Sequence, residues 1–85
     1  MERYTRREGD RIAVPQERLE EALARLAQLE DMMQDLAAQQ EEIPRRLQEL
    51  RSQGREKTVQ FRELLAQKLV NQNLCLLMER YGLRP

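Results

Sequence analysis

Residues 19–50 read LEEALARLAQLEDMMQDLAAQQEEIPRRLQEL, and this stretch decides the fold of the chain. Steps of seven residues from Leu19 reach Leu26, Met33, Gln40 and Leu47. The same steps from Ala22 reach Leu29, Leu36, Ile43 and Leu50. Nine of these ten positions are apolar, and two interleaved series of this kind are the a and d positions of a heptad repeat. The sequence therefore predicts a long helix whose apolar seam faces another helix.

The ends of two helices can be read from proline and glycine. Pro15 suits the first turn of the long helix, where its missing N–H has no partner to lose. Gly54 fits a left-handed residue just after that helix. A second helix is expected from about Glu56 to Tyr81, with Gly82 as its stop. The predicted fold class is all-α: residues 15–85 form an antiparallel helical hairpin.

Pro44 lies inside the long helical run and offers two interpretations. It could end one helix and begin another, or it could bend one continuous helix at the cost of a hydrogen bond. Ile43 and Leu47 keep the heptad phase of Leu36 across the proline, whereas a loop would usually reset it. We therefore expect a continuous first helix that is kinked at Pro44.

Residues 1–14 differ in composition from the rest of the chain. Residues 3–7 (RYTRR) and 11–14 (RIAV) flank Glu8-Gly9-Asp10, a turn-like triplet in which glycine can adopt positive φ. Both a small β-hairpin and a disordered arm are compatible with this pattern. A hairpin would need the helices to support it, because two isolated strands are marginally stable in water.

The second helix carries apolar residues on two sides. At 100° per residue, one broad face holds Phe61, Leu64, Leu65, Leu69, Cys75 and Leu76. The opposite face holds Val59, Val70, Leu74, Leu77 and Tyr81. A helix buried on both sides needs two partners, and the chain supplies one. We therefore predict a coiled-coil-like homo-oligomeric bundle, with an interface formed by Leu19, Ala22, Leu23, Leu26, Leu74, Leu76, Leu77, Met78 and Tyr81.

The amide residues Asn71-Gln72-Asn73 interrupt the apolar second helix. Polar amides at such positions often fix helix register and oligomeric state at some cost in stability. They could instead line a small cleft between subunits. Register is the preferred interpretation.

Composition excludes several functional classes. The chain has 85 residues, a single cysteine (Cys75) and no histidine, so a metal site, a cofactor and nucleophilic catalysis are not expected. We predict that the protein is not an enzyme. No apolar run is long enough for a membrane span, and the expected location is the cytoplasm of a bacterial host.

Basic residues gather around the expected turn between the helices. Residues 1–44 hold six arginines and eleven acids, whereas residues 45–85 hold nine Lys or Arg and four acids. The cluster consists of Arg45, Arg46, Arg51, Arg55, Lys57 and Arg62. Together with the N–H groups that begin the second helix, these side chains are suited to phosphate. The alternative is a solvated surface that pairs with the acidic half of another subunit.

Several short segments carry a resemblance to a protein family. Arg3-Tyr4-Thr5, the Glu8-Gly9-Asp10 turn and residues 24–31 (ARLAQLED) resemble the openings of small uncharacterised phage and prophage proteins of clostridial bacteria. Residues 54–83 are similar to the same group, through Lys57-Thr58, FRELL at 61–65, Lys68-Leu69 and Tyr81-Gly82-Leu83. The resemblance includes no motif with a known role, so it transfers no site residue. It implies an accessory gene of a mobile element.

These observations lead to three functional hypotheses. In the first, the protein is a phage-type accessory protein that sequesters an anionic ligand, such as a cyclic nucleotide signal, or a host defence protein. In the second, it is a structural coiled-coil scaffold without a ligand. In the third, it is a DNA-binding regulator, which would need a recognition helix that a long hairpin does not obviously offer. We do not expect nucleic acid to be the main partner.

Overall fold

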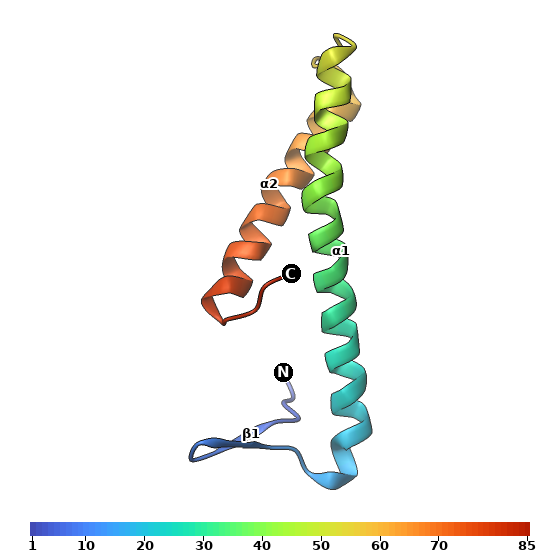
Figure 1. Ribbon diagram of the computed structural model, residues 1–85. Helices are drawn as coiled ribbons and strands as arrows, with labels where there is room; N and C mark the ends of the chain where they lie inside the picture. The colour runs from blue at the N-terminus through green and yellow to red at the C-terminus, as the bar shows by residue number, and fades with distance from the viewer. The chain divides into compact units, whose positions relative to one another are not determined.

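The computed structural model describes residues 1–85 and is mostly helical (Figure 1). Along the chain it contains strands β1 (Arg6–Glu8) and β2 (Arg11–Ala13), a 3-10 turn η1 (Gln16–Arg18), and helices α1 (Leu19–Ser52) and α2 (Val59–Arg80). The residues divide into two compact units, Met1–Asp31 and Met32–Pro85, and the long helix α1 belongs to both.

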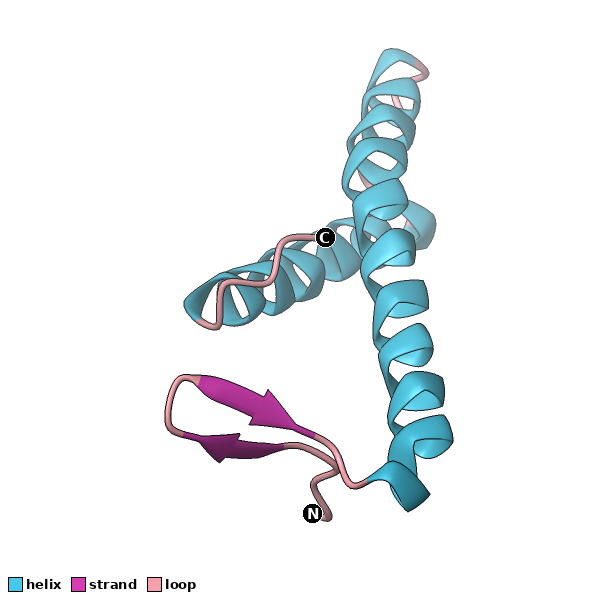
Figure 2. Cartoon of the chain, turned by 60° about the horizontal axis from the view of Figure 1, so that its bottom comes forward, coloured by secondary structure: helices cyan, strands magenta, loops and turns pink.

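The first unit contains a β-hairpin of two three-residue strands (Figure 2). The strands are antiparallel, and Glu8 pairs with Arg11 across a two-residue turn. Gly9 has φ +63°, while no non-glycine residue of the chain has positive φ. Positive φ at the first turn position alone is the pattern of a type II′ turn, whose twist matches that of paired strands. The glycine in the sequence triplet therefore has the conformational role expected of it.

Helix α1 begins after a single 3-10 turn and continues through Pro44. The amide of Arg18 donates to the carbonyl of Pro15 at 2.9 Å, and Glu20 and Glu21 occupy the first α-helical turn, where the macrodipole favours carboxylates. Pro44 lies inside the helix, so the carbonyl of Gln40 loses its usual i+4 donor. The prediction of one continuous first helix is confirmed. The bend at Pro44 stays a prediction.

Both helices end at a glycine with positive φ. After α1, Gly54 has φ +69°, and the amide of Arg55 donates to the carbonyl of Leu50 at 2.8 Å. After α2, Gly82 has φ +78°, and the amide of Leu83 donates to the carbonyl of Met78 at 3.0 Å. These six-to-one bonds define Schellman motifs, which satisfy carbonyls that a helix end would leave unpaired.

Helix α2 begins three residues later than the sequence suggested. Thr58 is its N-cap, with extended backbone angles, and the Oγ1 atom of Thr58 accepts a hydrogen bond from the amide of Phe61 at 3.2 Å. A threonine hydroxyl suits this position because it satisfies one of the four free amides of the first turn. Residues 53–58 consequently form the connection between the helices.

In the second unit the two helices pack as a hairpin. The buried residues of α1 are Leu36, Ile43, Leu47 and Leu50. The buried residues of α2 are Phe61, Asn71, Cys75 and Met78. The centre of the core is a cluster of Ile43, Leu47, Leu50 and Phe61, with Leu64 packed against it. All four buried positions of α1 are positions that the heptad repeat selected.

The residues of α2 that pack on α1 form a narrower stripe than the broad apolar face visible in the sequence. Its positions from Phe61 to Met78 alternate in steps of three and four residues, and they include the half-buried Lys68 and the buried Asn71. Leu65, Leu69 and Leu76 share the broad apolar face of Phe61 and Leu64, but 37–58% of their surface is exposed. Within one chain α1 covers only a narrow stripe of α2, and a stripe of heptad period passes beside these leucines.

Neither helix is long and apolar enough to cross a membrane.

Candidate functional site

The basic residues at the interhelical turn are close in sequence but are distributed over different sides of the helices. Arg45 is engaged with two acids: its guanidinium contacts Glu42 at 2.6 Å and Glu49 at 3.2 Å. These contacts, led by the hydrogen bond to Glu42, raise the pKa of Arg45. Arg45 therefore contributes little free positive charge to an anion site.

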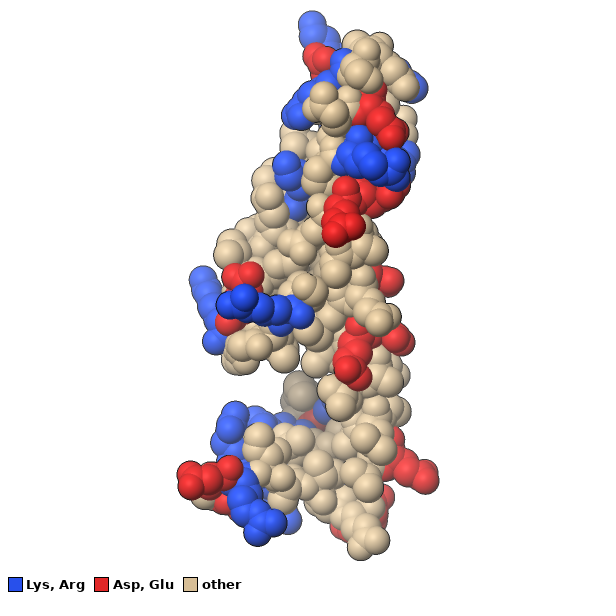
Figure 3. Space-filling model, viewed as in Figure 1, with Lys and Arg blue, Asp and Glu red and all other residues tan.

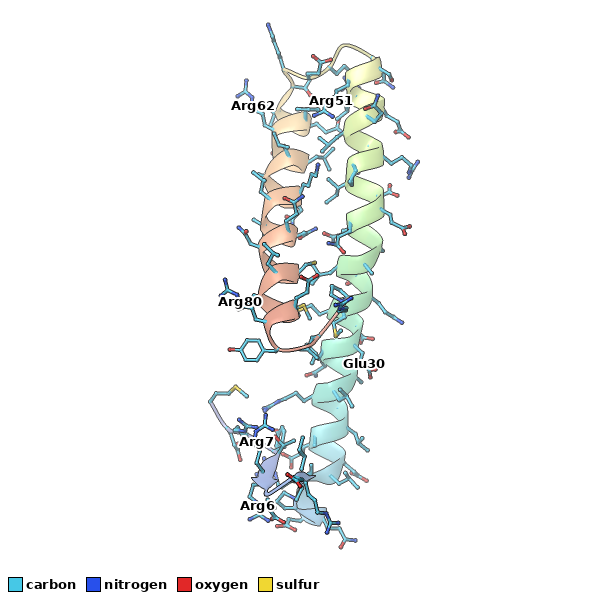
Figure 4. The ribbon with its side chains drawn as sticks, turned by 60° about the vertical axis from the view of Figure 1, so that its left-hand side comes forward. Arg6, Arg7, Glu30, Arg51, Arg62 and Arg80 are labelled. Atoms are coloured by element: carbon cyan, nitrogen blue, oxygen red, sulfur yellow. The ribbon has the colours of Figure 1, made fainter.

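Arg51 lies against the core of the second unit. The carbon of its guanidinium is 5.3 Å from the centroid of the Phe61 ring, a cation–π distance. Figure 4 shows Arg51 between the two helices, whereas Arg62 points away from α1. The side chains of Arg51 and Arg62 consequently do not converge on one ligand position.

The remaining basic residues carry free charge. Arg46, Arg55, Lys57 and Arg62 are exposed, and none of them forms an ion pair. The first turn of α2, however, is partly occupied, because Thr58 already accepts from the Phe61 amide. Figure 3 shows acidic and basic atoms interspersed at the turn end of the hairpin. The turn has unpaired positive charge, and its anion-binding role stays a prediction.

An exposed apolar surface lies along α2 to one side of its buried seam. Here Val59, Val70, Leu74, Leu77 and Tyr81 are exposed, with exposed fractions from 38% for Leu74 to 77% for Tyr81. We call these five residues the outer face of α2. Figure 3 shows uncharged atoms over much of the part of α2 in view. A contiguous apolar face on a helix is typical of an interaction surface.

The expected interface residues fall into three groups. Leu74, Leu77 and Tyr81 are on the outer face of α2, and Leu76 is exposed on a different side of the helix. Met78 was assigned to the interface, but it is only 7% exposed and lies in the buried seam of α2. Met78 is therefore part of the core of its own chain. In the first unit Leu19, Leu23 and Leu26 are about half exposed, and Ala22 is half-buried.

The N-terminal arm of the first unit is held by two arginines of the adjacent helical turns. The Tyr4 ring lies 4.6 Å from the guanidinium carbon of Arg18 and 4.1 Å from that of Arg25. Arg18 also binds the Glu2 carboxylate at 2.7 Å and the Glu21 carboxylate at 2.8 Å. Arg25 donates to the backbone carbonyl of Glu2 at 2.7 Å. These contacts fix residues 2–4 on the helix.

The arm also shifts the pKa of one acid. The hydrogen bond from Arg18, together with its positive charge, lowers the pKa of the Glu2 carboxyl below the usual glutamate range. The reciprocal contacts, led by the bond to Glu2, raise the pKa of Arg18. One signal for this arrangement is visible in the sequence: Arg18 and Arg25 are seven residues apart, a spacing that puts both on one side of a helix. Tyr4 as the residue between them could not be inferred.

An open groove with a volume of about 550 Å³ lies between the arm and α1. Its lining is mostly apolar and comprises Met1, Arg3, Tyr4, Thr5, Ala22, Arg25, Leu26 and Leu29. Ala22, Leu26 and Leu29 are heptad positions of the first unit. The heptad pattern predicts Ala22 and Leu26 as interface residues, but it does not predict a groove, since the position of the arm cannot be read from it.

A second, smaller cavity of about 120 Å³ lies in the hairpin and is lined by Gln39, Gln40, Pro44, Lys68, Asn71 and Gln72. Gln40, whose carbonyl Pro44 leaves without a helical donor, is one of the lining residues. The buried amide of Asn71 donates to the Oε1 atom of Gln39 at 2.7 Å and accepts from the Nε2 atom of Gln67 at 2.8 Å. A volume of this size with such partners suits one or a few water molecules.

No cluster of three or more His, Cys, Asp and Glu side chains is arranged to hold a metal ion. The buried thiol of Cys75 is in the seam. No protein-family model, no curated protein and no solved structure matches the chain. The phage origin, the host and the role in defence therefore stay predictions.

Proposed function

We propose that the protein is a non-enzymatic helical assembly module whose copies associate through the outer face of α2. The observation that carries this proposal is the exposure of Val70, Leu74, Leu77 and Tyr81, which are spaced by four, three and four residues. This spacing forms one stripe along the helix, and the stripe lies to one side of the seam of Phe61, Asn71, Cys75 and Met78 that packs on α1. A second copy of the same stripe is a chemically matched partner.

The area of the outer face is sufficient for a weak to moderate dimer. Its five side chains expose roughly 400–500 Å² of largely apolar surface, which amounts to about 1,000 Å² when two copies pair. Glu63 is the one charged residue on the same line of α2, so self-pairing brings few like charges together. An isologous pair about a two-fold axis would set Leu74 against Leu77 of the second copy.

The test is the mass of the full chain by light scattering after size exclusion, over a micromolar concentration series. The wild type is expected to be a dimer or a larger oligomer, and the double variant Leu74→Glu, Leu77→Glu a helical monomer. Gln48→Glu, at an exposed position of α1, is the control for added negative charge and should leave the mass unchanged. A monomeric wild type would contradict the proposal.

A second candidate function, sequestration of an anionic ligand, is supported by the unpaired charge of Arg46, Arg55, Lys57 and Arg62. Association of copies would multiply this charge, as expected for a protein that captures nucleotide signals. Such a site binds phosphate through exposed charges, so its affinity should fall steeply with salt. Thermal-shift measurements with cyclic dinucleotides should show stabilisation that Arg55→Ala reduces and that Arg45→Ala, with its charge already paired, leaves nearly unchanged.

A further inference from the structure

We propose that the groove between the N-terminal arm and α1 binds a free single-chain amphiphile with an apolar tail and an anionic head, the chemistry of a fatty acid. The groove lies entirely within the first unit. Its volume of about 550 Å³ is in the range of small-molecule sites, which are mostly apolar with a few polar groups that orient the ligand.

The apolar part of the site comes from α1. Ala22, Leu26 and Leu29 are spaced by four and three residues, so they form a continuous strip along one side of the helix. Leu26 is 50% exposed, and no other side chain of the chain covers it fully. The ring of Tyr4 also lines the groove, and the two guanidinium groups beside it hold it in place. This strip suits an unbranched hydrocarbon chain.

The polar part of the site is cationic. Arg3 and Arg25 line the groove, and no carboxylate does. Neither arginine forms an ion pair: Arg3 donates one hydrogen bond to the Oγ1 atom of Thr5 at 3.1 Å, and Arg25 donates one to the Glu2 carbonyl. The Glu2 carboxylate, the nearest acid in sequence, is already bound by Arg18. Each guanidinium retains N–H donors, and a carboxylate or phosphate head is the complementary group.

The same charge pattern favours an anionic amphiphile over a second copy of α2. The outer face of α2 offers only Glu63 as an acid on its line, and Arg62 and Arg80 lie beside it, pointing away from α1 (Figure 4). Placing that face in the groove would bring arginines toward Arg3 and Arg25. A concave groove suits a single amphiphile molecule that is free of a membrane. Binding to a membrane surface calls instead for an apolar face that projects from the protein.

The experiment is isothermal titration of the full chain with dodecanoate below its micellar concentration, compared with dodecanol and with acetate. Saturable dodecanoate binding is expected, with dodecanol at least about tenfold weaker and acetate without measurable binding. Equal binding of dodecanol, or no saturable binding of dodecanoate, would overturn the proposal. If the protein sedimented with phosphatidylglycerol vesicles but did not bind free dodecanoate, the proposal would also be overturned.

Two matched pairs of variants locate the site. Ala22→Leu fills the strip and should weaken dodecanoate binding at least about tenfold, whereas Ala24→Leu, at an exposed position outside the groove, should not. Arg3→Met should weaken binding by about tenfold and Arg7→Met, on β1, should not. Affinity unchanged by both Ala22→Leu and Arg3→Met would show that the ligand lies elsewhere. If Ala22→Leu changed the mass of the assembly while dodecanoate failed to bind, the occupant would be a second copy and the proposal would be wrong.

Discussion

The Nδ2 atom of Asn71 on α2 donates a 2.7 Å hydrogen bond to the Oε1 atom of Gln39 on α1. Asn71 is 3% exposed, and it occupies a seam position where the heptad pattern would favour leucine. The bond joins residues 32 positions apart in the chain. Because an amide pair is satisfied in one alignment only, it specifies the register of the hairpin at some cost in stability.

Asn71→Leu should therefore stabilise the helices while weakening their specificity. We expect the free energy of unfolding to rise by about 1 kcal/mol, since a leucine in the seam buries apolar surface in place of an amide. More than one oligomeric species should form. Urea unfolding and light scattering measure the two effects, with the exposed Asn73→Leu as control. A destabilised variant with a single mass would show that Asn71 contributes stability and not register.

Leu47→Ala should be the most damaging truncation in the core. Leu47 is 1% exposed and belongs to the cluster with Ile43, Leu50 and Phe61. Removing its buried methyl groups leaves a cavity and should lower the free energy of unfolding by about 2–4 kcal/mol. Leu69→Ala, at a position that is 55% exposed, should change it by less than about 1 kcal/mol. Chemical unfolding followed by circular dichroism measures the free energy of unfolding of both variants. An equal loss in Leu47→Ala and Leu69→Ala would show that the core lies elsewhere.

Thr58→Ala tests the cap that sets the start of α2. Without the Oγ1 acceptor the amide of Phe61 loses its partner, and the expected cost is about 1 kcal/mol. Thr58→Ser retains the hydroxyl and should recover most of the loss. The Ser52 hydroxyl at the other end of the turn only donates to the carbonyl of Glu49, so Ser52→Ala should cost less. Thermal unfolding ranks the three variants.

The contact between Glu2 and Arg18 makes docking of the arm dependent on pH. The pKa of Glu2 is lowered in the folded chain, so the charged form stabilises the docked arm. This contribution is present above the usual pKa of glutamate and is lost as the pH falls through the lowered pKa. Carboxyl NMR should give a Glu2 pKa below the usual range, and Arg18→Met should return it to that range. Arg11→Met, which removes an exposed arginine of β2, should leave the pKa of Glu2 unchanged. A Glu2 pKa in the usual range in the wild type would argue against the contact with Arg18.

The candidate sites were predictable to different degrees. The basic residues at the turn are adjacent in sequence, yet Arg45 is bound by Glu42 and Glu49, and Arg51 lies over Phe61. A sequence shows that charges are near one another but not which acid neutralises them. The groove could not be predicted, because it depends on where the arm lies. The stack of Tyr4 between Arg18 and Arg25 positions that arm, and no periodic pattern marks it.

The sequence by itself determined the helical architecture of this protein. Local chemistry is sufficient for this: the heptad series selected Leu36, Ile43, Leu47 and Leu50, and only glycine readily adopts the positive φ that ends each helix. Only the tertiary structure decided which side of α2 is buried. Several stripes of α2 are apolar enough to pack on α1. The contacts of Asn71 and Phe61 with α1 select one of them, and these contacts join residues that are distant in the sequence. That choice leaves Leu74 and Leu77 exposed, and with them the surface through which we propose that copies associate.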